Sequence, residues 1–255
     1  MKNKVTIHKK NHMVRGTDDY SVMGKRALNT VYWAMQKHNL YKHDLIAIRF
    51  STMRSMMKLE SDQRYVETIK DALRELRKPM EINNFKHPIT GDEFQWFSCS
   101  VLDEAGFKKN DAGEWVVHLK VSTIFKYVMQ LKGSFTPLEL IEYANSFRTK
   151  YGAKLYEYLK SFGGLKYLDI TQKHMMKLLN LDEKSKYRYY SDLYILVERQ
   201  TKEIAKKSDL KQVKLLKSKA LSKDKIFRIQ INPKSKKEVD KIEAKTVLDN
   251  LVKRF

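Results

Sequence analysis

The sequence predicts an α+β fold made of two tandem winged-helix domains, and three observations lead to this prediction. A helix with basic residues on its polar side is followed by a β-hairpin twice, over 62–78 with the strands after Met80, and over 186–204 with the hairpin 213–231. The spacing of apolar residues places a helix, a strand and a second helix before each pair. Turn residues separate the predicted strands. In a winged helix with this order of elements, the last helix and the hairpin are the parts that contact DNA.

The composition indicates a folded protein with a polyanionic partner. The 255 residues suffice for one large or two ordinary domains, and 42% of them are hydrophobic, which is typical of a globular chain. The formal net charge is +21, with 51 lysine and arginine residues against 30 aspartate and glutamate residues. This imbalance favours nucleic acid as the partner, with an anionic membrane surface as the second possibility.

The sequence predicts neither secretion nor a membrane span. No apolar stretch approaches the roughly 18 residues that a membrane-spanning helix needs. The basic N-terminus lacks the apolar segment of a secretory signal. The single cysteine, Cys99, cannot form an internal disulfide, so we expect the protein in a reducing cytoplasm.

Residues 1–18 predict a basic N-terminal arm without regular structure, and residues 19–132 predict the first winged-helix domain. The apolar residues of 62–78 fall on one helical stripe, which Pro79 ends. After Pro79 the pattern changes from helical to extended, which predicts a three-strand meander. The predicted elements are a helix over 20–38, a strand over 44–50, a short helix from Ser51, the helix 62–78, strands over 80–85, 94–102 and 115–121, and a closing helix over 122–131.

Residues 133–232 predict the second winged-helix domain, with the boundary at Lys132-Gly133-Ser134. Thr136-Pro137-Leu138-Glu139 matches a capping box with proline in the first turn, which predicts a helix start. The further elements are a helix over 148–162, a strand over 165–170, a helix from Thr171, a long helix over 186–204 and the hairpin 212–231. Residues 233–255 predict an amphipathic tail that either packs on the second domain or joins a partner.

The basic residues gather at the two points that a winged helix presents to a duplex. A helix rich in lysine and arginine commonly just has a solvated face, but here the charge concentrates at the start of the second long helix and around the tip of the second hairpin. Arg188 suits a bidentate contact with a guanine edge, and the nearby lysines suit phosphates. The candidate DNA contacts are Gln63, Arg64, Lys70 and Arg74 in the first domain, and Lys184, Lys186, Tyr187, Arg188, Tyr189, Arg199, Lys217, Lys219, Lys223 and Lys225 in the second.

The sequence shows no catalytic motif. The tyrosine cluster at 187–194 raises the alternative of a nucleophile that nicks DNA, but such sites usually hold a metal with two histidines around one apolar residue. None of the seven histidines forms a His-x-His pair or an HExxH motif, and no Gly-x-x-x-x-Gly-Lys-Ser/Thr sequence is present for ATP. Core packing and phosphate contact explain the tyrosines more simply. We therefore expect no enzyme activity, no metal and no cofactor.

The most specific motif of the chain is Tyr-x-x-x-Leu-Tyr-Glu-x-Leu, which lies within 150–160. With four further segments, it resembles the tandem winged-helix replication initiators of iteron-containing bacterial plasmids, the Rep_3 family. The resemblance covers roughly residues 20–232. The segments that carry it are Leu28–Met35, Tyr65–Leu76, Phe135–Leu140, Lys150–Lys160, and Ser191–Leu196 with Lys202-Glu203-Ile204.

The resemblance implies a mechanism. Monomers bind directly repeated iterons at the plasmid origin, the bound array helps to open an AT-rich region, and the host initiator and replicative helicase are recruited. Homodimers made through the first winged helix often bind an inverted repeat and repress the initiator's own gene. By position, the resemblance makes residues 186–189 and the four candidates of the first domain the contacts to bases and backbone. The arm before Tyr20 and the tail after Pro233 match no motif of the family.

Two other classes of protein compete with this interpretation. A winged-helix transcriptional repressor without a role in initiation more typically needs one such domain, so two domains argue against it mildly. A rolling-circle nicking enzyme is opposed by the missing histidine pair. Directly repeated sites beside the gene favour the initiator, whereas a lone inverted repeat favours the repressor.

Overall fold

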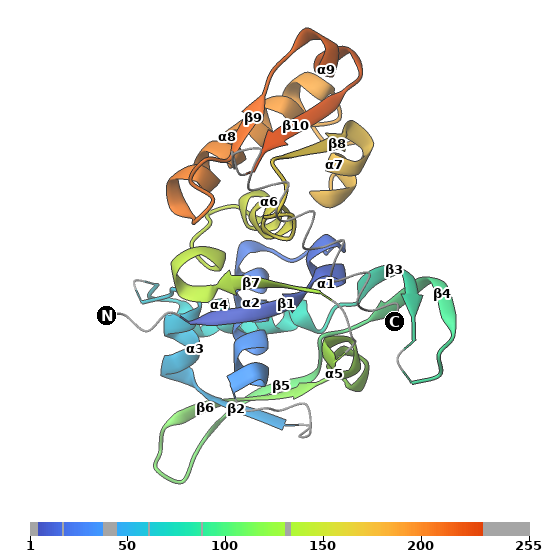
Figure 1. The fold of residues 1–255 in the computed structure, drawn as a ribbon. Helices are drawn as coiled ribbons and strands as arrows, with labels where there is room; N and C mark the ends of the chain where they lie inside the picture. The colour runs from blue at the N-terminus through green and yellow to red at the C-terminus, as the bar shows by residue number, and fades with distance from the viewer. Residues whose placement is uncertain are drawn as a thin grey trace, which may run out of the picture. The chain divides into compact units, whose positions relative to one another are not determined.

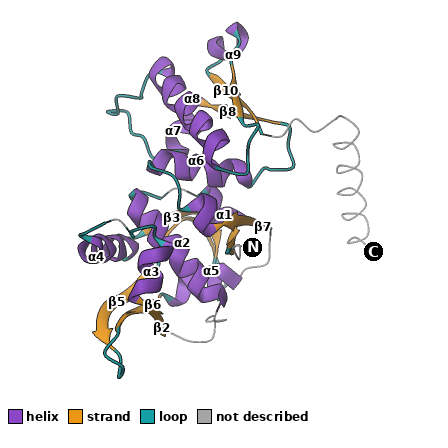
Figure 2. Cartoon of the chain, turned by 90° about the vertical axis from the view of Figure 1, so that its left-hand side faces the viewer, coloured by secondary structure: helices purple, strands orange, loops and turns teal. Residues whose placement is uncertain are grey.

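The computed structural model describes residues 5–16, 18–37, 45–60, 62–87, 89–130 and 134–231 (Figure 1 and Figure 2). The chain divides into two compact units, one of residues 1–157 with 178–180 and one of residues 158–177 with 181–255. Helices and strands are mixed in both units, which confirms the predicted α+β fold. The predicted tail 233–255 lies outside the described residues, as do residues 132 and 133 of the predicted boundary.

The first unit has the element order of a winged helix with one inserted hairpin. Its three-stranded antiparallel sheet has the strand order β2-β6-β5. Ile46 and Ile48 lie opposite Leu119 and Val117 in this sheet, and all four are buried, so alternate residues of the strands face the core. In order, the elements are α2 (Val22–Lys37), β2 (Leu45–Arg49), α3 (Phe50–Met56), α4 (Tyr65–Leu76), the inserted hairpin of β3 (Met80–Lys86) and β4 (Glu93–Cys99), the wing of β5 (Leu102–Lys109) and β6 (Trp115–Val121), and α5 (Thr123–Gln130).

Helix α4 is amphipathic, as the sequence predicts, but it begins at Tyr65 rather than at Asp62. The carboxylate of Asp62 shapes the turn before it, because one oxygen accepts a hydrogen bond from the Arg64 N–H and the other accepts one from the Thr68 hydroxyl, each at 2.8 Å. One face of α4 is buried and the opposite face is exposed to solvent. The buried residues, at helical spacing, are Ile69, Ala72, Leu73 and Leu76.

The predicted three-strand meander is wrong in one respect, because β3 and β4 form a separate two-stranded sheet. The predicted strand 94–102 is interrupted after Cys99, and the wing strand begins at Leu102. Between them, Val101 is fully buried and its N–H donates to the Leu76 carbonyl, 3.1 Å away. This bond joins the chain to the end of α4 and separates the inserted hairpin from the wing.

The N-terminal segment is not the unstructured arm predicted for residues 1–18. Strand β1 (Thr6–Lys10) pairs antiparallel with β7 (Phe135–Glu139), and helix α1 (Asn11–Arg15) follows β1. Both strands lie outside the predicted first domain, 19–132, yet they belong to the first unit. The first unit therefore extends beyond the predicted boundaries on both sides.

Strand β7 occupies the place where the capping box predicts a helix start, so that prediction is wrong. The Thr136 hydroxyl donates to the side-chain oxygen of Asn11, 2.7 Å away, and does not cap a helix. Thr136 and Leu138 are buried whereas Pro137 between them is exposed, which is the alternation of a strand. Proline is tolerated because a strand of a two-stranded sheet has one edge without partners. A short π-helical turn, η2 (Leu140–Ala144), follows.

The second unit repeats the order of elements without an inserted hairpin (Figure 1). Its strand order, β8-β10-β9, corresponds to β2-β6-β5 of the first unit. The predicted hairpin 212–231 is present, with a short helix at its tip. The elements are the end of α6 (Lys150–Lys160), β8 (Tyr167–Thr171), most of α7 (Gln172–Leu178), α8 (Tyr190–Lys207), and the wing of β9 (Lys214–Leu216), α9 (Lys219–Lys223) and β10 (Ile226–Gln230).

Helix α8 begins at Tyr190, so the basic residues predicted in its first turn lie in the segment before it. The Arg188 N–H donates to the Ser185 carbonyl at 3.1 Å, and the Arg188 carbonyl accepts a bond from the Gln172 side-chain amide at 2.7 Å. Tyr189 then has extended backbone angles, φ −83° and ψ 145°. These bonds hold the segment in a turn and keep it from continuing the helix.

Aromatic packing fixes α8 on its wing. The ring of buried Phe227 on β10 lies 4.9 Å from the ring of Tyr190 and 6.3 Å from that of Tyr194, centroid to centroid. The Tyr190 hydroxyl donates to the Ile226 carbonyl, 2.9 Å away. The buried residues along the helix are Leu193, Leu196, Val197, Gln200, Thr201 and Ile204.

Candidate nucleic-acid interface

One side of helix α8 is exposed to solvent. Ser191, Ile195, Arg199 and Lys202 are exposed and follow one another at intervals of three or four residues, so they share this side. Lys202 pairs with Glu198 at 3.2 Å. Arg199 makes no ion pair with any residue that the structure describes, and its guanidinium is available to a ligand.

The segment before α8 carries two cations stacked on neighbouring tyrosines. The Arg188 guanidinium lies 4.8 Å from the ring centroid of Tyr189 and donates to its hydroxyl at 3.0 Å. The Lys186 ammonium lies 5.1 Å from the ring of Tyr187. Tyr187 is half-buried, whereas Lys186, Arg188, Tyr189 and also Lys184 are exposed. Stacking restricts a long side chain without neutralising its charge, so both cations remain available to an anion.

The tyrosine cluster is explained by packing and stacking. The Tyr190 hydroxyl is committed to a backbone carbonyl, and burial raises the pKa of Tyr190 and of Tyr194, which disfavours a phenolate nucleophile. Within the described ranges, no group of three or more histidine, cysteine, aspartate or glutamate side chains is arranged to hold a metal ion. In the same part of the chain, no helix has the length and apolar character that a membrane span requires.

The wing of the second unit carries exposed lysines around its tip. Lys217 follows β9, Lys223 ends α9, and Lys225 precedes β10 with a left-handed backbone, φ +53°. The Leu221 N–H donates to the Ser218 hydroxyl oxygen at 3.1 Å and fixes the start of α9. The side chain of Lys219, also a predicted contact, lies outside what the structure describes. The predicted lysine-rich tip is therefore a short, capped helix rather than a plain turn.

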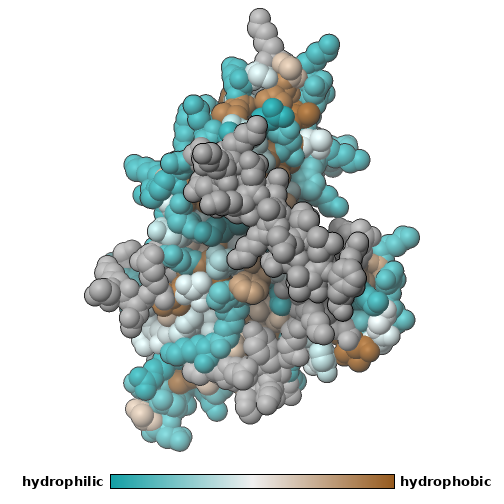
Figure 3. Space-filling model, viewed as in Figure 1, coloured by the Kyte–Doolittle hydropathy of each residue, from teal (hydrophilic) through white to brown (hydrophobic). Residues whose placement is uncertain are grey.

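An open groove of about 610 Å³ lies between α8 and the wing. Tyr194 and Glu198 line it from the helix, and Lys214 and Lys217 line it from the wing side. Its lining carries both signs of charge, so the groove is no simple anion site. Figure 3 shows hydrophilic residues over much of the visible face of the second unit, with several hydrophobic residues among them.

The first unit exposes its predicted contacts, Gln63, Arg64, Lys70 and Arg74. Two of them are paired with acidic residues on the same helix. The Lys70 ammonium lies 3.4 Å from Glu67, and the Arg74 guanidinium lies 2.8 Å from Asp71. The outward side of α4 is therefore close to neutral.

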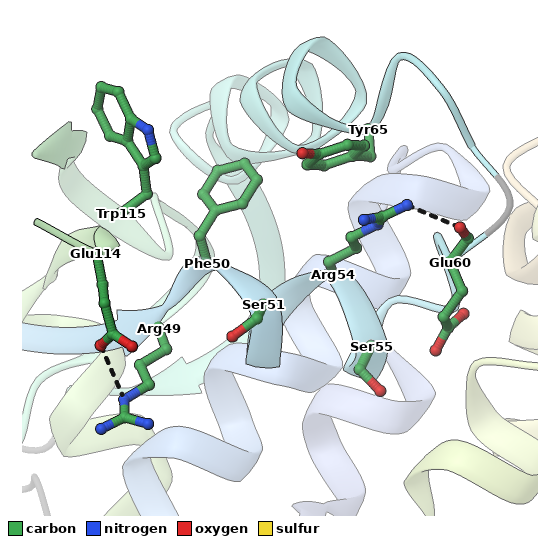
Figure 4. A pocket seen from close by; sticks show the side chains of 9 residues that line it. All are labelled: Arg49, Phe50, Ser51, Arg54, Ser55, Glu60, Tyr65, Glu114 and Trp115. Carbon is green, nitrogen blue, oxygen red and sulfur yellow. Dashed lines mark hydrogen bonds and ion pairs between the residues drawn. The ribbon is translucent and has the colours of Figure 1, made fainter. Parts of the chain in front are cut away.

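A pocket of about 540 Å³ beside α3 contains two arginines that the sequence reasoning missed (Figure 4). Figure 4 shows Arg54 directed at the Glu60 backbone carbonyl, 2.7 Å away, and Arg49 directed at the Glu114 carboxylate, 3.6 Å away. Arg54 also lies over the ring of Tyr65, 4.0 Å from its centroid. Their position in the sequence could have indicated them, because they lie at α3, the first of the two helices before the wing. In helix-turn-helix proteins this first helix crosses the DNA backbone. The Arg54 guanidinium is committed to backbone carbonyls, whereas the Arg49 side chain pairs with Glu114 and is 71% exposed.

The order of helices and strands in the two units defines a winged-helix protein. Comparison with known families identifies it further, because residues 6–160 match the model described as initiator replication protein, WH1. This match covers more than half of the chain, so the chain belongs to this family of DNA-binding replication initiators. The resemblance read from the sequence motifs is confirmed.

A search for relatives among curated proteins gives no match. Two crystal structures are distantly similar in fold. One, of selenomethionine derivatives of domain 2 and domain 3 of RctB, has 13% identity, covers 82% of this chain and 80% of that chain, and gives a TM-score of 0.46. The other, of RctB domains 2-3, has 13% identity, covers 85% of this chain and 82% of that chain, and gives a TM-score of 0.41.

Proposed function

We propose that the protein initiates plasmid replication by binding directly repeated iterons at the origin, promoting origin opening, and recruiting the host initiator and replicative helicase. The observation that carries this proposal is the set of unneutralised cations on the second unit. Lys186 and Arg188 are stacked on tyrosines, and neither they nor Arg199 have an acidic partner among the described residues. Cations of this kind displace counterions from DNA and confer affinity that falls steeply with salt.

We further propose a division of roles between the predicted domains. The second, 133–232, makes the main sequence-specific contacts, and the first, 19–132, contacts the DNA backbone and forms a homodimer in equilibrium with the monomer. The neutralised charges of α4 support the weaker DNA role of the first. Its inserted hairpin exposes Phe94 and Trp96, which supports a contact with a second copy. The dimer represses the protein's own gene.

The protein acts in the cytoplasm without a catalytic residue, metal or cofactor of its own, because the host helicase supplies the motor. The alternative function is a winged-helix transcriptional repressor without a role in initiation. The inserted hairpin, suited to a dimer, is the observation that favours it.

The test is footprinting of the purified protein on the DNA that flanks its own gene. We expect protection of directly repeated sites of about two helical turns, and permanganate-reactive thymines in a neighbouring AT-rich region when the DNA is supercoiled. The Arg188→Glu variant serves as the control that fails to protect. Protection of a lone inverted repeat without strand opening would support the repressor instead, and absence of any protected site would contradict both functions.

A further inference from the structure

Ile195 is the most exposed large hydrophobic side chain in the described part of the chain, with 64% of its surface accessible. It lies in the second turn of α8, on its outward side, one turn after Ser191 and one turn before Arg199. A single exposed isoleucine on an ordinary surface needs no explanation. Its position matters here, because the N-terminal part of a recognition helix is the part that contacts base edges in the major groove.

The surroundings of Ile195 argue against a protein partner. A helix that docks in an apolar groove carries hydrophobic residues at several positions spaced three and four apart. The exposed residues of α8 are Ser191, Ile195, Arg199, Lys202 and Lys206, and only one of them is apolar. Ile195 is therefore a single apolar side chain on a polar surface. It suits a polar ligand that offers a single apolar group at the contact.

The major groove of DNA presents such a group, since the thymine C5-methyl is the apolar feature among its hydrogen-bond donors and acceptors. We propose that Ile195 reads a thymine methyl group in the repeat that α8 binds. This inference rests on the proposed function, in which α8 contacts origin DNA. Arg199 lies one helical turn away, about 6 Å along the axis, which corresponds to roughly two base pairs. The thymine is therefore expected within a few base pairs of the DNA group that Arg199 contacts.

The experiment replaces each thymine of the footprinted repeat in turn with deoxyuridine, which removes one methyl group and leaves base pairing intact. We expect the affinity of the unaltered protein to fall about fourfold at one position, as for exposing one methyl group to water. The Ile195→Ala variant binds the thymine and deoxyuridine repeats equally. Leu165→Ala is the matched control, because Leu165 is also exposed, at 46%, in the same unit but outside α8, and it retains the preference. Melting curves of the variants check that both remain folded.

Each other outcome overturns the proposal. A normal footprint with no thymine sensitive to deoxyuridine removes the methyl contact but leaves the proposed function standing. Sensitivity that persists in Ile195→Ala assigns the methyl contact to another residue. An altered oligomeric state of Ile195→Ala with an unchanged thymine preference makes Ile195 a protein contact. Absence of any footprint by the unaltered protein removes the proposed function together with this inference.

Discussion

Helices α4 and α8 hold the same place in their winged helices, but their positive charges differ in environment. Each begins with a tyrosine and exposes its second, sixth and tenth residues. In α4, a carboxylate three residues earlier pairs with each of the two cations, at 3.4 Å and 2.8 Å. In α8, Arg199 has no such partner within the described residues. The exposed residues at these positions are Val66, Lys70 and Arg74 in α4, and Ser191, Ile195 and Arg199 in α8.

The first unit also contains positive charges that are buried and paired with carboxylates. Asp18 contacts the ammonium groups of Lys25 and Lys154, and Lys9 lies 2.8 Å from Glu157. These side chains are at most 9% exposed, so they form ion pairs with one another and are not accessible to a ligand. The number of basic residues on a helix therefore does not by itself show how much positive charge is available to a ligand, because paired cations are partly neutralised.

The largest effect is expected from removing the buried acid of the first unit. Asp18→Asn leaves Lys25 and Lys154 buried without their counter-charge, which lowers the free energy of unfolding by about 3–5 kcal/mol at pH 7. Asp169→Asn is the matched control in the second unit, because Asp169 forms an exposed pair with Arg228 and its loss has a much smaller effect. Urea unfolding of the three proteins measures the difference. Equal losses would show that burial of the first pair does not matter.

The same variant alters the pH dependence of stability. Burial alone would raise the pKa of Asp18, but Lys154 and Lys25 outweigh it and hold the pKa well below its usual range. A depressed pKa contributes stability that is complete above the unfolded-state value of about 4 and is lost as the pH falls below it. The unaltered protein therefore loses this contribution on acidification below about pH 4, whereas Asp18→Asn lacks it at every pH. Parallel acid unfolding curves would contradict this.

The buried pairs also explain what the sequence could and could not predict. The apolar stripes of α4 and α8 depend on neighbours within a few residues, so their spacing alone predicts both helices. Strand β1 is not predicted, because its basic segment has the composition of a solvated arm. In the structure, Lys9 of this segment pairs with Glu157, which is distant in the sequence. The start of α8 is misplaced for a related reason, since Gln172 of α7 holds the preceding turn. The exposure of the candidate DNA contacts follows from sequence, and so does the pairing of Lys70 and Arg74 with acids three residues earlier, but the turn before α8 does not.

The second effect in size tests the contrast between α4 and the segment before α8 directly. We expect Arg188→Glu to lower affinity for the origin repeats about 100-fold or more, because it removes a groove contact and adds repulsion. Arg74→Glu in α4 lowers it about tenfold or less, since Arg74 is already paired with Asp71. Gel-shift titrations at one salt concentration compare the two variants. Equal losses would mean that α4 contacts DNA as closely as the second unit does.

The wing lysines test the same contrast through salt. With about 6–10 phosphates contacted, affinity of the unaltered protein falls roughly 10³–10⁵-fold between 50 and 200 mM salt. Replacing both Lys217 and Lys223 with alanine lowers the slope of log affinity against log salt by about 2. Lys70→Ala, which removes a lysine paired with Glu67, leaves the slope nearly unchanged. A steeper change for Lys70 than for the wing would reverse the assignment of the two units.

The smallest effect separates two arginine–tyrosine stacks that look alike. Tyr189→Ala lowers DNA affinity roughly 2–5-fold, because an exposed cation–π contact contributes about 0.5–1 kcal/mol, and Tyr189→Phe retains most of it. In the first unit, Arg54 stacks on Tyr65 but also donates to the backbone carbonyls of Leu59 and Glu60. Tyr65→Ala is therefore expected to lower the melting temperature and leave affinity nearly unchanged. If Tyr65→Ala instead weakens DNA binding at an unchanged melting temperature, the stack of the first unit contacts DNA. The contrast between paired and unpaired cations would then not hold for Arg54 and Arg188.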